Sequence, residues 1–402
     1  MSKIIKTNND SLKSSLTISE VSKLIRGRKI SPLELVERCL ENIKEYRKLN
    51  AFITVSEEEA RAAANKAEKQ IKAGHWKGEL HGVPIAVKDF YDTAGIRTTA
   101  ALEHFKDRVP KKDAAVVRRL KEQGAILIGK TNMHTLGMGT TSLESYFGRI
   151  INPVNHKYVA GGSSGGSAVA VATGMCYATV DTDAIGSCRI PAACCGVTGF
   201  KASNGFINMK GILEGEQADE AIVQLSAVGI TTRFAGDTEL LLKVLANNKK
   251  TKNIRPKKAL KIGIVQNFSA NEEIKKSFLK LAKMVTKQKI LPVIIPFERA
   301  RFDLRNIKRD REAVNRLLFK NVDLLLLPTL SDNTPTIQQA IKKGPQAIAP
   351  ANTFFCNYFG LPAISLNYDT DSKGLPLGFQ VVGKPNHDLE VIGFAKSFNK
   401  MS

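Results

Sequence analysis

Long apolar runs are missing from this chain of 402 residues. No uninterrupted stretch reaches the roughly 18–20 apolar residues that a membrane-spanning helix needs. The first six residues, MSKIIK, also lack the apolar segment of a secretory signal. These absences predict a cytoplasmic protein without membrane contact.

Cysteine and histidine are scarce, with six of each in the whole chain. Their spacing fits neither a zinc site nor a small-domain disulfide framework. His134 has no ligand partner at helical spacing, so we expect it to be structural or to line a pocket. The sequence therefore predicts no metal site, and it predicts buried free thiols at Cys39, Cys176, Cys188, Cys194, Cys195 and Cys356.

Acidic residues are fewer than basic ones, 38 against 60, which gives a net charge of +22. Such a charge suits a nucleic acid or an anionic membrane as a partner. The lysines are spread along the whole chain, however, and no aromatic residues lie between their runs to stack on bases. We therefore expect a lysine-rich solvated surface and not a nucleic-acid-binding groove.

Helix signals and short apolar runs alternate along the chain. Capping boxes at Thr17 and Ser31 predict two helices, and helical patterns cover 57–72 and 113–123. Apolar, strand-forming runs lie at 83–87, 125–128, 261–265, 292–295, 322–327 and 363–366. Helices that alternate with short apolar strands predict an α/β fold with a largely buried sheet.

Two stretches match known functional motifs by their letters alone. Residues 124–131, GAILIGKT, fit the phosphate-loop pattern, but their apolar middle predicts a strand instead of an open loop of N–H groups. Residues 161–165, GGSSG, fit the nucleophile elbow of α/β-hydrolases, which needs an acid and then a histidine downstream. His387 is the only histidine after Ser163, and the residues before the motif are polar. The elbow stays open as an alternative.

Three segments together suggest chemistry. Lys88 directly follows the apolar run 83–87, where a buried charge is costly. Either its ammonium reaches the surface, or it is held neutral and acts as a base. Segments 161–167 and 181–192 place Ser163 and Ser187 among glycines, which let backbone N–H groups approach a reacting centre closely.

In this order, the three segments resemble the amidase signature family. The resemblance runs from about Leu16 to the C-terminus and is strongest over 81–201. Supporting stretches are 92–100, 129–133, 146–148, 152–153, 199–201, 326–329, 360–363 and 374–383. It implies an α/β/α sandwich with a large mixed β-sheet flanked by helices.

The sequence also predicts a division of the chain. Residues 1–16 are polar, so we expect them to be disordered, and the resemblance implies that 17–402 form one amidase domain. Within it, 17–75 would be a helical N-terminal layer, 76–247 the catalytic core and 261–402 the C-terminal part. The basic, polar stretch 249–258 is the expected surface linker.

Roles carry over residue by residue as a Ser–Ser–Lys triad. The resemblance implies that Ser187 is the nucleophile, that Ser163 relays protons and follows a cis peptide bond, and that neutral Lys88 is the base. It implies no cofactor. Asp183 and Arg189 flank the nucleophile, and we expect them to form a structural ion pair. The groups expected to hold the oxyanion or the substrate belong to Ala184, Ile185, Gly186, Met138 and Gly139, together with the Ser187 N–H.

The chain departs from the family pattern at three places. Ile185 stands where the family usually has the first of two glycines, and a β-branched residue does not readily adopt positive φ. The loop is therefore either misaligned or already suited to isoleucine; the retained triad favours the second reading. Segment 202–227 matches poorly and 295–321 is short, and both lie where specificity is set.

The sequence thus predicts an amidase that cleaves a linear carboxylic amide to an acid and ammonia or an amine through a Ser187 acyl-enzyme. One alternative is the glutaminase subunit of a tRNA-dependent amidotransferase, which shares the relay. Another is a catalytically impaired binding protein on the same scaffold. The expected partner is a small-molecule amide, and a homodimer stays open.

Overall fold

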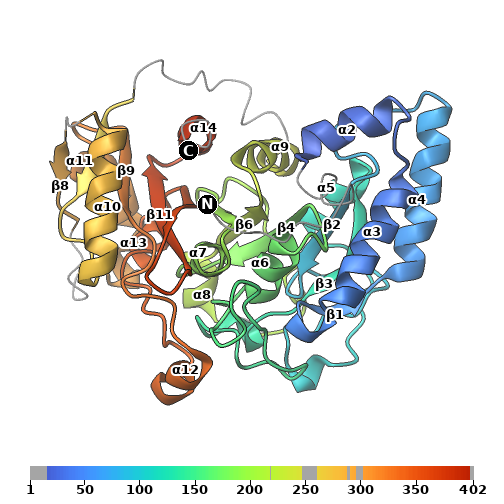
Figure 1. The fold of residues 1–402 in the computed structure, drawn as a ribbon, viewed down its shortest axis with the longest axis horizontal. Helices are drawn as coiled ribbons and strands as arrows, with labels where there is room; N and C mark the ends of the chain where they lie inside the picture. The colour runs from blue at the N-terminus through green and yellow to red at the C-terminus, as the bar shows by residue number, and fades with distance from the viewer. Residues whose placement is uncertain (1–15, 218, 247–259, 288–289, 296–301, 399–402) are drawn as a thin grey trace.

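The computed structural model describes residues 16–217, 219–246, 260–287, 290–295 and 302–398. Within them, eleven strands form one mixed sheet (Figure 1). From one edge to the other, the strands are β1 (Phe52–Val55), β3 (Ile126–Thr131), β2 (Pro84–Lys88), β4 (Ala178–Asp183), β6 (Ala227–Thr232), β5 (Thr198–Lys201), β10 (Ala363–Thr370), β11 (Pro376–Gly383), β9 (Leu324–Pro328), β7 (Ile262–Val265) and β8 (Leu291–Val293).

The strand directions place the ends of β2 and β4 side by side. β2 runs parallel to both β3 and β4, with Val87 opposite Val180, so Lys88 and the polar end of β4 leave the sheet together. β4 and β5 both run antiparallel to β6. The pairing of β5 with β10 then carries the same sheet into the C-terminal part.

Three helices form the N-terminal layer at one end of the sheet (Figure 1): α2 (Ile18–Arg26), α3 (Pro32–Glu45) and α4 (Glu57–Lys72). Both predicted capping boxes are present, at Thr17 and at Ser31. Such a cap stabilises a helix by about 1 kcal/mol. The buried face of α2 includes Ile18 and Val21, and α4 packs on β3.

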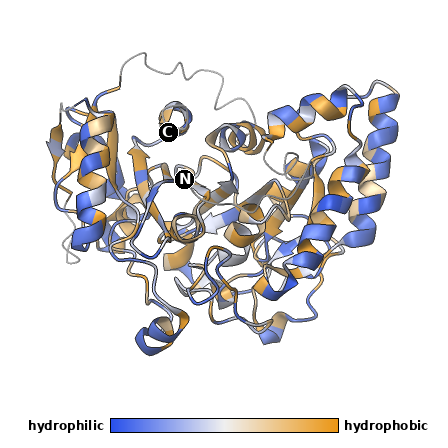
Figure 2. Ribbon diagram, viewed as in Figure 1, coloured by the Kyte–Doolittle hydropathy of each residue, from blue (hydrophilic) through white to orange (hydrophobic). Residues whose placement is uncertain are grey.

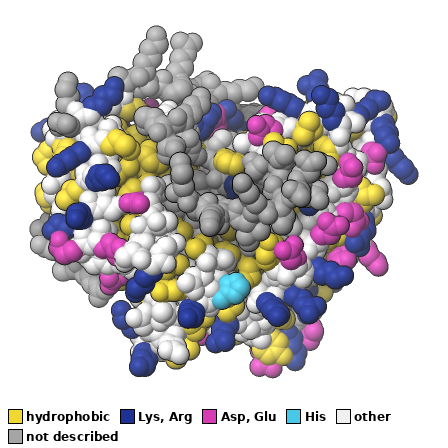
Figure 3. All heavy atoms as spheres, viewed as in Figure 1, with side chains coloured by type: hydrophobic (Ala, Val, Ile, Leu, Met, Phe, Trp, Pro, Cys, Tyr) yellow, Lys and Arg dark blue, Asp and Glu magenta, His cyan; other side chains and the backbone are white. Residues whose placement is uncertain are grey.

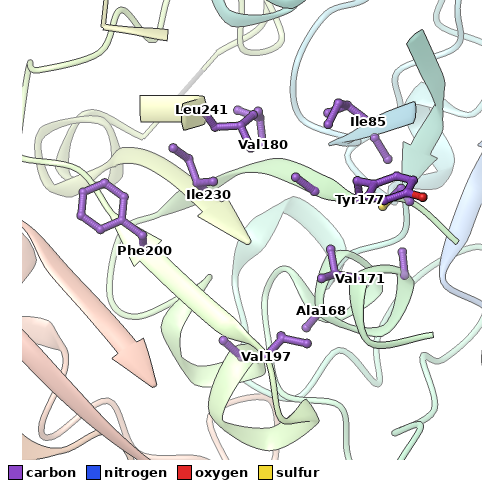
Figure 4. Close-up of a cluster of buried hydrophobic side chains, with 14 of the residues drawn as sticks. Ile85, Ala168, Val171, Tyr177, Val180, Val197, Phe200, Ile230 and Leu241 are labelled. Carbon is purple, nitrogen blue, oxygen red and sulfur yellow. The ribbon is translucent and has the colours of Figure 1, made fainter. Parts of the chain in front are cut away.

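Central helices cover both faces of the middle strands. They are α5 (Ala115–Glu122), α6 (Gly165–Ala172), α7 (Arg189–Cys195), α8 (Glu220–Leu225), α9 (Ala235–Leu245) and α14 (Asp388–Phe398). In Figure 4, Leu241 of α9 lies beside Val180 and Ile230, while Ala168 and Val171 of α6 lie on the other side of the strands. Fully burying a valine, leucine or isoleucine side chain stabilises the fold by roughly 1.5–3 kcal/mol.

The C-terminal part adds α10 (Glu272–Val285), α11 (Ile307–Leu318), α12 (Ile337–Lys343) and α13 (Phe354–Tyr358). Four short 3-10 turns complete the described elements: η1 (Arg47–Leu49), η2 (Glu103–Phe105), η3 (Thr135–Gly137) and η5 (Leu304–Asn306). Figure 2 shows hydrophobic strands between helices that carry hydrophilic residues on one side. α12 projects at the bottom of Figure 1.

The predicted α/β/α sandwich with a large mixed sheet is confirmed. All six predicted strands are present, with their ends shifted by a few residues, and GAILIGKT contains β3 instead of a phosphate loop. The prediction missed β1, β4, β5, β6 and β11. Threonine, aspartate and glycine interrupt the apolar pattern of β4, β5 and β6, although every residue of these three strands is buried.

The proposed division of the chain stays a prediction. Residues 1–15 and the predicted linker 249–258 lie outside the described residues. Every described helix is too short or too polar to traverse a lipid bilayer. Lysine and arginine side chains are scattered over the visible face and do not gather in one groove (Figure 3).

Candidate active site

Lys88 ends β2 and points into the protein. Its side chain is fully buried, and Nζ donates to Ser163 Oγ at 2.7 Å and to Thr182 Oγ1 at 3.0 Å. The Phe90 ring centroid lies 5.4 Å from Nζ. Burial lowers the pKa of Lys88 to about 8, although Asp181 and Asp183 act in the opposite direction. The alternative of an ammonium that reaches the surface is therefore wrong, and a neutral amine is accessible near neutral pH.

Ser163 is enclosed by the segment around η3. The peptide bond Gly162–Ser163 is cis, as the resemblance implied. The Ser163 carbonyl accepts a hydrogen bond from His134 N at 2.9 Å. Gly137 has φ +71°, and a Cβ there would lie 2.8 Å from the Phe90 ring, while a Cβ on Gly162 would lie 2.9 Å from the Gly139 carbonyl oxygen. Glycine is thus needed at both positions for the backbone to pack this closely.

Ser187 lies in the loop between β4 and α7, with 4% of its surface exposed. Its carbonyl accepts from Ser164 N at 3.1 Å, which joins the two serine loops. Gly186 has φ +131°, and a Cβ there would lie 2.5 Å from Thr353 Oγ1. Only glycine fits this position, so the glycine that directly precedes the nucleophile is required.

Ile185 is half-buried and its φ is not positive. Its carbonyl accepts from Thr353 Oγ1 at 2.5 Å, so a contact from the C-terminal part fixes the peptide. Because the backbone at this position lies outside the region that favours glycine, isoleucine does not force the loop out of shape. The geometry favours the reading in which the loop already suits isoleucine.

Asp183 and Arg189 form a fully buried ion pair, with Arg189 Nη2 3.0 Å from Asp183 Oδ1. Burial alone would raise the pKa of Asp183, but the guanidinium holds it well below its usual value. Asp183 also accepts from the backbone N–H groups of Gly186 and Cys188. Arg189 in turn donates to oxygens of Thr353, Gln380 and Asn357. The pair therefore ties the nucleophile loop to the C-terminal strands and helices.

This network also involves the expected oxyanion donors. The Gly186 N–H is bonded to Asp183 Oδ1 at 2.8 Å, and its role as an oxyanion donor stays a prediction. Among the described residues, no acceptor faces the N–H groups of Ala184, Ile185 or Ser187. These three N–H groups remain as candidates.

The second part of the expected substrate site is the loop after His134. The Met138 N–H donates to the Thr135 carbonyl at 3.1 Å, and the Met138 side chain is half exposed. Gly139 lies against the His134 ring, because a Cβ there would come within 2.2 Å of it. Burial lowers the pKa of His134. A role for Met138 and Gly139 in holding substrate stays a prediction.

Residues of the two motifs that are typical of other chemistries make contacts outside the candidate active site. Lys130 of the phosphate-loop pattern is buried and lies 3.3 Å from Asp89. His387 lies 3.1 Å from Glu390, and no described contact joins it to Ser163. All six cysteines are free and buried, as predicted. Within the described part of the chain, no group of three or more His, Cys, Asp or Glu residues is arranged to hold a metal ion.

Sequence reasoning missed several residues that contact the site. Thr182 binds Lys88, while Thr353 and Asn357 hold the nucleophile loop. Thr182 lies within segment 181–192, which was selected for its glycine-rich serine motif, so the sequence did contain a signal for it. Thr353 lies 168 residues from Ile185, and nothing local in the sequence marks it.

A buried lysine bonded to a serine, with a second serine in an adjoining glycine-lined loop, is an arrangement that can activate a serine nucleophile. The family model described as Amidase matches residues 34–309 and 297–392. The chain belongs to this family, the amidase signature enzymes, and amide C–N cleavage is the chemistry of its class.

The relatives include components of amidotransferases. The mitochondrial glutamyl-tRNA(Gln) amidotransferase subunit of the dog (Canis lupus familiaris) is 31% identical over 497 aligned residues, which cover 96% of this chain and 93% of that protein. The human mitochondrial protein is 30% identical at the same coverage. The alignment is longer than this chain, so these relatives carry segments that it lacks.

Solved structures share the fold over nearly the whole chain. A crystal structure described as an amidase has a TM-score of 0.83 at 27% identity and covers 96% of this chain and 100% of that one. The corresponding glutamyl-tRNA(Gln) amidotransferase subunit from Thermotoga maritima has a TM-score of 0.79 at 25% identity, with coverages of 97% and 95%.

Proposed function

We propose that the chain hydrolyses a carboxylic amide through an acyl-enzyme on Ser187. The observation that carries this proposal is the buried 2.7 Å hydrogen bond from Lys88 Nζ to Ser163 Oγ, in a loop that is joined to Ser187 through the adjacent Ser164 N–H. A lysine desolvated in this way is a base of suitable strength near neutral pH.

The relay moves one proton in each direction. Neutral Lys88 takes the proton of Ser163 Oγ, Ser163 takes that of Ser187 Oγ, and Ser187 Oγ bonds to the amide carbonyl carbon. The N–H groups of Ala184, Ile185 and Ser187 stabilise the oxyanion. As the C–N bond breaks, Ser163 gives its proton to the leaving nitrogen and takes one back from the Lys88 ammonium, which restores the neutral base. Water then attacks the ester by the same route, which releases the acid and restores Ser187.

Acylation by a fluorophosphonate probe tests this proposal without knowledge of the substrate. We expect intact-mass measurement to show one adduct, mapped to Ser187 by peptide digestion, and none in Ser187→Ala. Circular dichroism and thermal unfolding confirm that both proteins are folded. A folded wild-type protein that takes up no probe would overturn the proposal and favour the impaired binding scaffold.

Glutaminase activity is the second candidate function. It is favoured by the 31% identity to an amidotransferase component over most of both chains. The amidase family model matches this chain in two segments, 34–309 and 297–392, which meet inside the stretch predicted to be short. We infer that the relatives have a longer segment here, which would help to enclose the substrate. A protein partner that completes the pocket would reconcile the two observations.

The two candidates differ in their need for a second protein. We expect the purified chain to release ammonia from at least one simple amide in a screen of glutamine, indoleacetamide, malonamate and aryl amides. Ser187→Ala is the matched control for background hydrolysis. Ammonia release from glutamine alone, and only after a partner protein is added, would replace the first candidate with the second.

A further inference from the structure

A second acidic residue of β4, Asp181, lies next to the base and has no role in the relay described so far. β2 and β4 are parallel, and Val87 pairs with Val180, so Lys88 and Asp181 are the next two residues along neighbouring strands. Both side chains are fully buried. In such a low-dielectric setting, two charges influence each other strongly.

The hydrogen bonds of Asp181 are unevenly divided. Oδ2 accepts from Thr179 Oγ1 at 2.9 Å and from Thr231 Oγ1 at 2.7 Å, while Oδ1 has no hydrogen-bond partner among the described residues. Burial raises the pKa of Asp181, and these hydroxyls, Ser167 and Lys88 act in the opposite direction.

Asp181 differs from its neighbour Asp183 in how its charge is compensated. Asp183 has the guanidinium of Arg189 at 3.0 Å. Within the described part of the chain, Asp181 makes no ion pair, and Lys88 is the cation that acts on it. A carboxylate of this kind favours the ammonium form of the lysine, and its loss favours the free amine.

We propose that Asp181 is a positioning residue of the proposed relay: its carboxylate sets the charge state of Lys88 and stabilises the ammonium that forms when Lys88 takes the proton from Ser163. This inference rests on the proposed function. In this proposal β4 both positions the nucleophile loop and, through Asp181, sets the charge state of Lys88.

The other ionisable groups around the pair keep one charge state near neutral pH. Asp183 faces Lys88 but is neutralised by Arg189. Burial lowers the pKa of His134, which also faces Lys88, and this ring stays uncharged. Burial raises the pKa values of the groups that face Asp181, namely Tyr91, Cys176 and Cys188, so these too stay neutral.

The test is the pH dependence of Ser187 acylation by a fluorophosphonate, followed by intact mass between pH 5 and 10. Acylation of the wild type should rise with pH as Lys88 loses its proton. In Asp181→Asn this rise should move to lower pH by about one unit, the lower end of the effect of a nearby opposite charge. At pH 6 the variant should then react about tenfold faster relative to its own plateau.

A conservative variant covers the case in which Asp181→Asn does not fold. Thr231→Val removes one donor to Asp181 Oδ2, which raises the pKa of Asp181 and favours its uncharged form, so it should move the profile in the same direction by less. Thr232→Val on the same strand is the matched control, because its hydroxyl bonds to Thr238 and Phe234 instead.

A second control replaces another buried acid. Asp237→Asn removes a carboxylate that accepts from the Ile18 N–H, and it should leave the pH profile of acylation unchanged.

The outcomes separate the two proposals. If wild-type Ser187 is not acylated at any pH, the proposed function fails. If Ser187 reacts and the profiles of folded Asp181→Asn and Thr231→Val coincide with that of the wild type, the role of Asp181 is overturned and its burial is only structural. A shift of the same size in Asp237→Asn would also overturn it.

Discussion

Replacing Lys88 by alanine is expected to slow acylation of Ser187 by about 10²–10⁴-fold, the usual contribution of a general base. Lys88 Nζ binds Ser163 Oγ at 2.7 Å, and no other described base occupies that place. Lys88→Met keeps most of the side-chain volume and should lose the same activity, which separates loss of the base from loss of packing. Fluorophosphonate labelling rates by intact mass are the measurement.

The same experiment has a pH arm and a matched control. The pKa of Lys88 is lowered to about 8, and the base must be neutral, so wild-type acylation should fall about tenfold per pH unit below that value. His387→Ala should react like the wild type, because His387 contacts Glu390 and not Ser163. Loss of activity in His387→Ala with Lys88→Ala intact would instead establish the nucleophile-elbow mechanism.

Breaking the Asp183–Arg189 pair is expected to destabilise the protein by about 3–5 kcal/mol. Arg189→Met leaves a buried carboxylate without its cation and removes the donors to Thr353, Gln380 and Asn357. Reversible urea unfolding followed by circular dichroism measures the loss. The nucleophile loop should also be misplaced, so Ser187 labelling should fall in the fraction that remains folded.

The control for this prediction is the ion pair between Arg61 and Glu37, in which both side chains are more than a third exposed. Arg61→Met should leave the urea midpoint nearly unchanged, since exposed pairs contribute little. Reversal of both charges, by Asp183→Arg with Arg189→Asp, should not restore the fold, because the partners of the guanidinium lie on other elements. A reversed protein with normal folding and labelling would show that the pair has no structural role.

Sequence reasoning was most reliable where the signal was contiguous. The capping boxes at Thr17 and Ser31 involve residues three apart, and the predicted helix 57–72 coincides with α4. It was least reliable for the central strands β4, β5 and β6. Their threonines and aspartates read as loop residues, yet they are buried in the sheet. Thr231 of β6, for example, donates to Asp181 of β4 across the two strands.

The candidate site shows the same division. Lys88, Ser163 and Ser187 could be selected because each lies in a local pattern, an apolar strand end or a glycine-rich loop. That the Gly186 N–H binds Asp183 Oδ1 could not be predicted. Hydrogen-bond partners depend on how the loop turns, and the sequence motif does not specify this.

The sequence by itself determined the family, the class of fold and the residues able to carry the chemistry. Tertiary structure alone decided that Lys88 Nζ meets Ser163 Oγ, 75 positions away, that Thr353 fixes Ile185, and that Asp181 lies buried beside the base without an ion-pair partner of its own among the described residues. The physical reason is that caps and apolar periodicity arise from neighbouring residues, whereas the charge state of a buried lysine depends on the strands that the sheet order places next to it.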